Sequence, residues 1–325
     1  MRTRGGDEWS TGRKQKAGGV TPPALHSPAS GFADLHLHSL FSDGTFAPED
    51  IVAHGARFGH KALALTDHDT VEGCERMATA CTAAGIEFIV GTELTAEHNG
   101  NELHILAYFV DPHNPQLLTE IAKFQKVRQE RIHDMVGLIN ALGVPLKVAD
   151  VFELANCRSP GRPHVARALV QGGHCRTLDQ AFERFLKKNR PAWVPKAKMS
   201  ALAAVELIHQ ASGLAVLAHP GLNRTDQTIP AIVDAGLDGI ECFHTKHPPA
   251  TAAHYLAIAR QHNLLVTGGS DCHGLSKGKP LIGTVKLDYD YVEKLYAARN
   301  ARRASIASTA STTPIPAGGE RAEVR

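Results

Sequence analysis

The chain has 325 residues, of which 43% are hydrophobic and 21% are charged, and its formal net charge is +2. This composition is that of a globular protein with a substantial core, and the nearly balanced charge gives no argument for binding to nucleic acid or to a membrane surface. No apolar run approaches the roughly 18 residues that cross a bilayer. The six cysteines contain no C-x-x-C pair and suggest no disulfide framework, so we expect a cytoplasmic location.

Residues 1–31 are basic, rich in Gly, Ser and Pro, and unlike a secretory signal, so we expect them to be disordered. Beyond them, seven segments are candidate strands, namely 32–38, 62–66, 87–92, 103–109, 214–218, 238–243 and 264–269. Several of them, ALALT, FIVGT, LAVLA and LLVTGG, are brief and apolar, which is typical of buried parallel strands. Helical patterns lie between them, with Pro48 near the start of one helix and Gly85 and Gly236 where two others would stop. The alternation predicts an α/β barrel or an open doubly wound sheet.

One stretch interrupts this alternation. Residues 113–212 contain no convincing strand and include a long amphipathic helix over 117–143. We therefore expect a barrel built from residues 32–112 and 213–300, with residues 113–212 as a helical insertion that caps the substrate site. The stretch 301–325 is rich in Ala, Ser, Thr and Pro and is expected to be a disordered tail.

Residue types that bind metals gather at the ends of the predicted strands. In chain order they are His36, His38 and Asp43, then His68, Glu93, His104, His219, the group Glu241, His244 and His247, and finally Asp271 and His273. His104 is the exception, because it lies early in its strand. In an α/β barrel the carboxyl ends of the strands share one face, and that face holds the active site. Buried carboxylates are too costly to collect there without a cation.

Imidazole and carboxylate ligands without cysteine suit manganese, zinc or iron. The candidates are too many for one ion, so the sequence predicts two or three divalent ions, with Asp43 and Glu93 as candidate bridging carboxylates. Divalent ions roughly 3.5–4 Å apart serve phosphoester hydrolysis. Cys272 lies between two candidate ligands, and strand alternation would point its side chain away from the ions.

The motifs DLHLHSLFSDGT, LTDHDTVEG, GTEL, VLAHPG and GSDCHG occur in this order between Ala33 and Gly274, and they resemble those of the polymerase and histidinol phosphatase (PHP) superfamily. The resemblance implies a distorted seven-stranded (β/α) barrel with three metal ions at its C-terminal face. The implied ligands are His36, His38, Glu93 and Asp271 for the first ion, Asp43, His68 and His273 for the second, and Glu93, His104 and His219 for the third.

Manganese is the expected metal, with zinc or iron(II) as alternatives. A hydroxide that bridges the ions, held by Asp43, Glu93 and Asp271, is the expected nucleophile. Within the superfamily, Asp43 resembles the stand-alone phosphoesterases. The stretches SPGRPHVARALV and PAWVPK resemble nucleoside 3′,5′-bisphosphate phosphatases, which remove the 3′-phosphate from small nucleotides and whose relatives trim RNA from its 5′ end. The implied partners are a small phosphorylated nucleotide and short RNA, and no obligate protein partner is evident.

The insertion also supplies candidate contacts to the substrate. Arg162, in a Gly-Arg-Pro turn, would clamp a phosphate with two hydrogen bonds. Lys196 and Lys198 would add positive charge. The candidates to protonate the leaving oxygen are His164, His244 and His247.

Four further charged residues are expected to support the structure without binding metal or substrate. Asp67 would orient a ligand side chain without binding an ion itself, and Asp69 would cap the helix that follows it. Arg128 and Arg131 lie near Glu130 on the long helix, where ion pairing on the helix surface is expected.

The sequence thus favours a phosphoric ester hydrolase of small nucleotides. One alternative is a histidinol-phosphate phosphatase, which would differ in the insertion. A second alternative is a metal-binding PHP module without catalysis. An amidohydrolase-like barrel also begins with His-x-His but uses a bridging lysine, and the third predicted strand offers Glu93 at that place.

Overall fold

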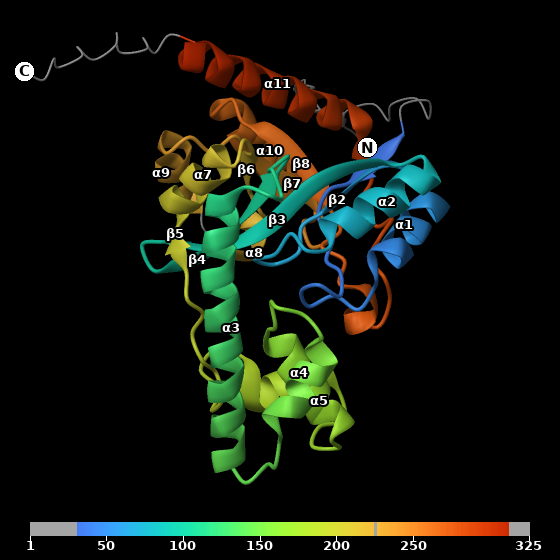
Figure 1. Ribbon diagram of the computed structural model, residues 1–325, viewed down its shortest axis with the longest axis vertical. Helices are drawn as coiled ribbons and strands as arrows, with labels where there is room; N and C mark the ends of the chain where they lie inside the picture. Colours follow the sequence, from blue (N-terminus) through green and yellow to red (C-terminus); the bar gives the residue numbers. More distant parts are fainter. Residues whose placement is uncertain (1–30, 224–225, 312–325) are drawn as a thin grey trace, which may run out of the picture.

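The computed structural model describes residues 31–223 and 226–311 (Figure 1). The predicted disorder of residues 1–31 lies outside this range except at Gly31, as does that of residues 312–325. The predicted strands are present as β1 (Phe32–Asp34), β2 (His60–Leu65), β3 (Glu87–His98), β4 (Asn101–Tyr108), β6 (Leu214–Leu217), β7 (Gly239–His244) and β8 (Leu265–Gly269). Two short strands, β5 (Met199–Ser200) and β9 (Leu287–Asp288), pair with β3 and β1.

The sheet has the order β8-β7-β6-β4-β3-β2-β1-β9. The strands of a regular α/β barrel are parallel, but β4 runs antiparallel to both β3 and β6. The cause is the two-residue turn between β3 and β4. Asn99 and Gly100 both take the left-handed backbone conformation, with φ of 49° and 78°, and an Asn-Gly pair adopts this conformation readily in a tight hairpin.

The sheet closes into a barrel through the chain that follows β1. The amide of Leu35 donates to the carbonyl of Gly268 at 3.1 Å, and the amide of Asp271 donates to the carbonyl of His36 at 2.9 Å. The first predicted strand therefore continues past β1 as extended chain. Its far end lies beside the chain that leaves β8, so residues from the two ends of the barrel sequence meet.

The barrel is surrounded by α1 (Pro48–Arg57), α2 (Cys74–Ala84), α7 (Ala201–Gln210), α8 (Pro220–Asn223), α9 (Ile229–Asp234), α10 (Pro249–Gln261) and α11 (Tyr289–Ser311). Helix α11 lies across the side of the barrel away from the long helix α3 (Figure 1). The predicted disorder of residues 301–311 is wrong, because α11 continues through them and the Arg302 guanidinium pairs with Asp238. Within the described residues, none of the helices combines the length and the apolar character needed to cross a membrane.

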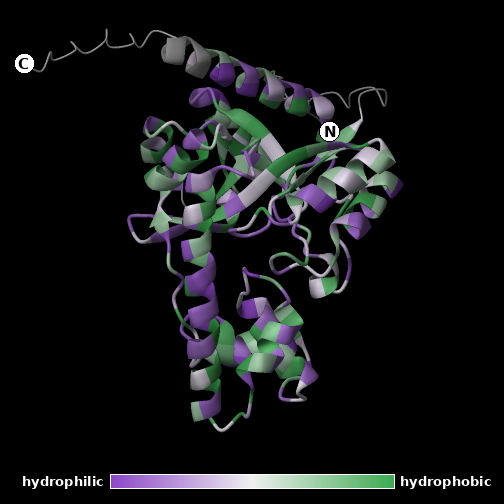
Figure 2. Cartoon of the chain, viewed as in Figure 1, coloured by the Kyte–Doolittle hydropathy of each residue, from purple (hydrophilic) through white to green (hydrophobic). Residues whose placement is uncertain are grey.

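The insertion forms a cap built from α3 (Pro115–Ala141), α4 (Val148–Ala155), α5 (Arg162–Gln171), α6 (Leu178–Ala181) and a π-helical turn, η1 (Phe182–Leu186). Leu117 and Ile121 at the start of α3 pack in the barrel core, whereas Ile132 and Met135 pack in a separate core of the cap. Figure 2 shows hydrophilic residues over much of α3 between barrel and cap. This helix is therefore shared by both cores.

The barrel resumes earlier than the predicted boundary at residue 213. Helix α7 lies within the predicted insertion, yet Ala204, Val205 and Ile208 pack in the barrel core. The side chain of Ser200 accepts a hydrogen bond from the amide of Ala203 and starts this helix directly after β5.

Candidate metal centre and adjoining pocket

The nine predicted ligands converge at one end of the barrel. They come from the chain after β1 and β2, from β3 and β4 themselves, and from the chain after β6 and β8. Their ligand atoms form four overlapping groups, each within 4.8 Å, a spread that ligands around one ion can have. The groups are His38, Asp43, His68 and His273; His36, His38 and Asp271; His36, Glu93 and His219; and His68, Glu93 and His104.

Glu93 lies at the middle of these groups. Its Oε1 is 2.8 Å from His104 Nδ1 and 3.1 Å from His219 Nε2. Its Oε2 is 3.0 Å from His68 Nδ1, and it also lies 3.3 Å from His38 Nε2. One carboxylate thus faces imidazoles from several strands, as a bridging ligand would.

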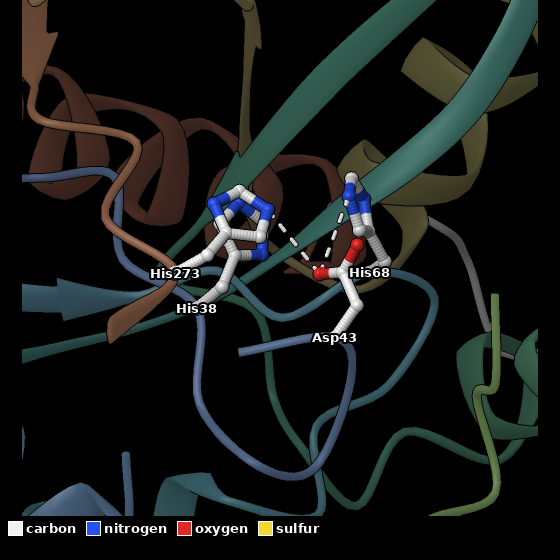
Figure 3. A group of neighbouring side chains, drawn as sticks. All are labelled: His38, Asp43, His68 and His273. Atoms are coloured by element: carbon white, nitrogen blue, oxygen red, sulfur yellow. Dashed lines mark ion pairs between the residues drawn. The ribbon is translucent and has the colours of Figure 1, made fainter. Parts of the chain in front are cut away.

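Asp43 forms a second centre, in the loop after β1. Its Oδ1 is 3.2 Å from His273 Nε2 and 3.9 Å from His68 Nε2. Figure 3 shows this carboxylate between the His68 ring and the stacked rings of His38 and His273. We call His38, Asp43, His68 and His273 the Asp43 group.

Asp271, in the chain after β8, contributes the last carboxylate of the candidate metal centre. Its Oδ1 is 3.3 Å from His38 Nε2, and its Oδ2 is 3.5 Å from His244 Nε2. Next to it, Cys272 turns away as predicted and packs in an apolar cluster with Leu37. His38 therefore belongs to the Asp43 group and also faces Asp271.

The antiparallel direction of β4 explains the early position of His104. Because β4 runs opposite to β3 and β6, its first residues lie beside the last residues of its neighbours. His104 pairs with Thr95 in β3, and its carbonyl accepts from the amide of Ala218, directly before His219. A ligand at the start of β4 therefore meets ligands at the ends of the other strands.

The charges of these residues suit cations. Burial raises the pKa of Glu93, but His104, His68 and His36 outweigh this and hold that pKa well below its usual value. Burial, His273 and His68 lower the pKa of His38 to about 3. Metal ions bind ionised carboxylates and neutral imidazoles, which are the forms favoured for Glu93 and His38.

Unsatisfied polar atoms provide a test of whether this residue set fits metal ions. Within the described part of the chain, several buried atoms that face the centre make no hydrogen bond, namely Asp43 Oδ1, Glu93 Oε2 and His68 Nδ1, although the last two lie 3.0 Å apart. Burial of such atoms without partners is costly. Divalent ions among them would remove much of this cost, so the residues fit the predicted metal centre.

Glu241 supports the centre from the middle of β7. The Nδ1 of His36 lies 3.1 Å from its Oε1, and the amide of His219 donates to its Oε2 at 2.8 Å. A buried glutamate in this place leaves His36 Nε2 to face the centre. The sequence places Glu241 among the metal-binding residue types at the strand ends but indicates no role for it.

Unusual backbone conformations occur at the same residues. His219 and Asp271 have φ of 28° and 53°, in the left-handed region that residues other than glycine seldom adopt. Gly269 is close-packed as well, since a Cβ there would lie 2.3 Å from His36 Cβ. Such strain persists where surrounding contacts impose it, which is common at functional sites.

The two aspartates beside His68 hold neighbouring segments. Asp67 accepts from the amide of Ser39 at 2.7 Å and from the hydroxyl of Ser42 at 2.5 Å, so it fixes the loop that carries Asp43 and does not contact a ligand ring through these bonds. The capping role predicted for Asp69 is wrong, because its carboxylate pairs with Arg128 at 2.6 Å.

A cavity of about 620 Å³ adjoins the centre on the cap side. Its lining contains Trp193, the acidic residues Glu97 and Glu102, and the cations Arg131, Arg162, Lys188, Lys196 and Lys198. Lys196 Nζ is 3.4 Å from His104 Nε2 and 3.1 Å from Glu102 Oε1, so this lysine connects the cavity to the metal centre. The predicted surface ion pairing of Arg128 and Arg131 is wrong, since both point inward from α3.

The other predicted substrate contacts lie around the start of α5 and the cavity. Arg162 lines the cavity, and its Nη1 donates to the carbonyl of Leu186 at 3.3 Å. Lys198 Nζ is 3.6 Å from Glu102 Oε2. His164 is buried, and its Nδ1 accepts from the amide of Gly161 at 3.0 Å.

The chain resembles known proteins over most of its length. Residues 34–187 match the PHP domain family. The chain is 32% identical over 260 residues to a 3′,5′-nucleoside bisphosphate phosphatase of Chromobacterium violaceum, with 77% of this chain and 90% of that protein covered. It is 32% identical over 251 residues to a 5′-3′ exoribonuclease of Haemophilus influenzae, with 74% and 89% covered. A protein of Bifidobacterium adolescentis, solved and assigned as a metal-dependent phosphoesterase, has a TM-score of 0.76 and 33% identity, covering 82% of this chain and 95% of that one.

Proposed function

The chain belongs to the PHP domain family, and on this premise we propose that it removes the 3′-phosphate of nucleoside 3′,5′-bisphosphates. It is a phosphoric ester hydrolase. The ligand sets that we propose are those implied by the sequence, with Glu93 shared between two ions. The oxygen and nitrogen donors suit manganese, with zinc or iron(II) as alternatives.

The observation that carries the proposal is the cationic cavity beside the metal centre. A nucleoside bisphosphate carries two phosphates, so one can lie at the metal centre while the other lies among Arg131, Arg162 and Lys196. Trp193 offers an aromatic face against which a base can stack. Histidinol phosphate carries an ammonium group instead of a second phosphate, and these cations would repel it.

When bound, divalent ions would supply an acidified water and neutralise phosphate oxygens. The residues of the chain bind and orient the substrate around them. Arg162 and Lys196 would hold the distal phosphate, and Glu102, 3.1 Å from Lys196 Nζ, keeps that ammonium in place. The Nδ1 of His164 accepts from Gly161, so the ring proton stays on Nε2, which would donate to a substrate oxygen.

We also propose a cytoplasmic location. All six cysteines of the chain are free, which suits a reducing cytoplasm.

The test is phosphate release by the purified full chain with Mn²⁺. We expect adenosine 3′,5′-bisphosphate to yield adenosine 5′-monophosphate, with histidinol phosphate turned over far more slowly. Arg162→Met should raise KM for the bisphosphate, whereas Arg184→Met, on the cap surface, should not. Preference for histidinol phosphate would overturn the proposal, and release of mononucleotides only from a 5′-phosphorylated oligoribonucleotide would replace it with an exoribonuclease function.

A further inference from the structure

Side chains of the cap hold the backbone of two loops that carry metal-centre residues. The hydroxyl of Ser159 donates to the carbonyl of His68 at 2.6 Å. The guanidinium of Arg167 donates to the carbonyl of Asp43. His68 and Asp43 both belong to the Asp43 group, so the position of the cap determines where two of its ligands lie.

Helix α3 makes a third connection of the same kind. Arg128 donates to the Asp69 carboxylate at 2.6 Å, and the side chain of Gln125 donates to the Asp69 carbonyl at 3.2 Å. Asp69 directly follows His68 and has a left-handed backbone, with φ of 47°. The residue after a candidate ligand is therefore fixed by a helix whose far half belongs to the cap.

Helices α3 and α5, which hydrogen-bond to these loops, also line the cationic cavity. Helix α3 carries Arg128 toward Asp69 and Arg131 into the cavity. Helix α5 carries Arg162 into the cavity and Arg167 toward Asp43. A shift of either helix would therefore change the cavity and the Asp43 group together.

Among the described residues, α3 and α5 each carry a buried hydrogen-bond donor that has no acceptor. Arg131 Nη2 and Arg167 Nε are buried and make no hydrogen bond within the described residues. Burial, Arg162 and Arg128 lower the pKa of Arg131 to about 9, because this guanidinium is buried beside other cations. A phosphate in the cavity would satisfy donors there and hold the two helices in place.

We propose that the cap couples the two sites, so that a nucleotide phosphate in the cavity strengthens the binding of a divalent ion at the Asp43 group. The identity of the anion rests on the proposed function. Because coupling is reciprocal, an ion at the Asp43 group strengthens nucleotide binding by the same factor. Ser159 and Arg167 are positioning residues in this account, since they contact the loops and not the ions.

The test measures Mn²⁺ binding to the metal-free full chain by competition with a chromophoric chelator, with and without adenosine 5′-monophosphate. In the unmodified chain, we expect the nucleotide to tighten the weakest Mn²⁺ site about fivefold. In Ser159→Ala and Arg167→Met, we expect this site to be about tenfold weaker without nucleotide and the tightening to disappear. Arg184→Met is the matched control, because Arg184 donates to the His174 carbonyl within the cap, and it should behave as the unmodified chain.

Two outcomes would overturn the inference. One is an unmodified chain whose Mn²⁺ affinity does not respond to the nucleotide. The other is full tightening in Ser159→Ala, a variant that loses one hydroxyl and whose folding is checked by thermal melting; this would mean that the nucleotide contacts the ions directly without the cap. The measurement needs no turnover, so a chain that shows the coupling but does not hydrolyse bisphosphates would contradict only the proposed substrate.

Discussion

Glu241 and His36 illustrate how a residue outside the ligand set controls a ligand. Glu241 is fully buried between the His36 ring and the amide of His219. Burial lowers the pKa of His36, but Glu241 and Glu93 together outweigh it and raise that pKa well above its usual value. A buried acceptor of this kind fixes which nitrogen of the imidazole carries the proton. The orientation of His36 toward Glu93 therefore depends on β7, a strand that contributes no predicted ligand.

We predict that Glu241→Ala weakens Mn²⁺ binding by about 10–100-fold, because His36 loses the partner that orients its ring. Glu241→Gln should restore part of the affinity, since its amide oxygen can still accept from His36 Nδ1. Isothermal titration of the metal-free chain with Mn²⁺ measures both. Wild-type affinity in the alanine variant would show that packing alone orients His36.

His164 should make stability depend on pH in the acid range. Burial and the nearby Arg167 lower its pKa from 6.5 to about 4. Between these values the unfolded chain binds a proton that the folded chain does not, so this contribution to stability is present above pH 6.5 and is lost as the pH falls toward 4. At pH 5, the loss amounts to about 2 kcal/mol relative to neutral pH.

The check compares urea unfolding of the metal-free chain and of His164→Asn at pH 5 and pH 7. Asparagine keeps an acceptor for the Gly161 amide but does not titrate. Between pH 7 and pH 5, the free energy of unfolding of the variant should therefore fall by about 2 kcal/mol less than that of the unmodified chain. An identical pH dependence in both chains would mean that His164 is not held neutral.

At the residue scale, the sequence allowed the convergence of the nine candidate ligands to be predicted, because strand ends of a barrel share one face. The roles of Glu241 and Arg167 could not be predicted in this way. Each acts through a hydrogen bond to a residue more than a hundred positions away. Sequence spacing shows only neighbours on the same helix, which is why Arg128 was expected to pair on the surface of α3 and not with Asp69.

At the scale of elements, the hairpin of β3 and β4 is the main departure from expectation. Apolar runs indicate strands but carry no direction. The Asn99-Gly100 pair between two apolar runs is the signal that would have predicted an antiparallel pair. The same hairpin explains why His104, alone among the nine candidates, lies early in its strand.

The packing of helix α11 on the barrel can be tested in the same way. Val292 and Leu295 are buried against the barrel, so the C-terminal helix contributes to the core. We predict that Leu295→Ala lowers the free energy of unfolding by about 3 kcal/mol, because it leaves a cavity between helix and sheet. Glu293→Ala, on the exposed side of the same helix, should change it by less than about 0.5 kcal/mol. Urea unfolding measures both, and equal effects would mean that α11 is not docked.

At the scale of the whole molecule, the barrel and the cap have separate apolar cores joined by α3. The barrel carries the metal-binding residue types, and the cap provides most of the cations of the cavity. Composition indicated a helical insertion but not its end, because the apolar face of α7 fits either core. Only the packing of Val205 and Ile208 assigns that helix to the barrel.

In the proposed function, phosphate release requires metal ions at the Glu93-centred site and a nucleotide bound in the cavity. The most direct measurement is the rate of phosphate release from adenosine 3′,5′-bisphosphate as a function of the number of Mn²⁺ ions bound per chain. We predict no release from the metal-free chain, a rise as two or three ions bind, and neither full loading nor activity in Glu93→Gln. Full activity without bound metal, or in a Glu93→Gln chain, would contradict the account.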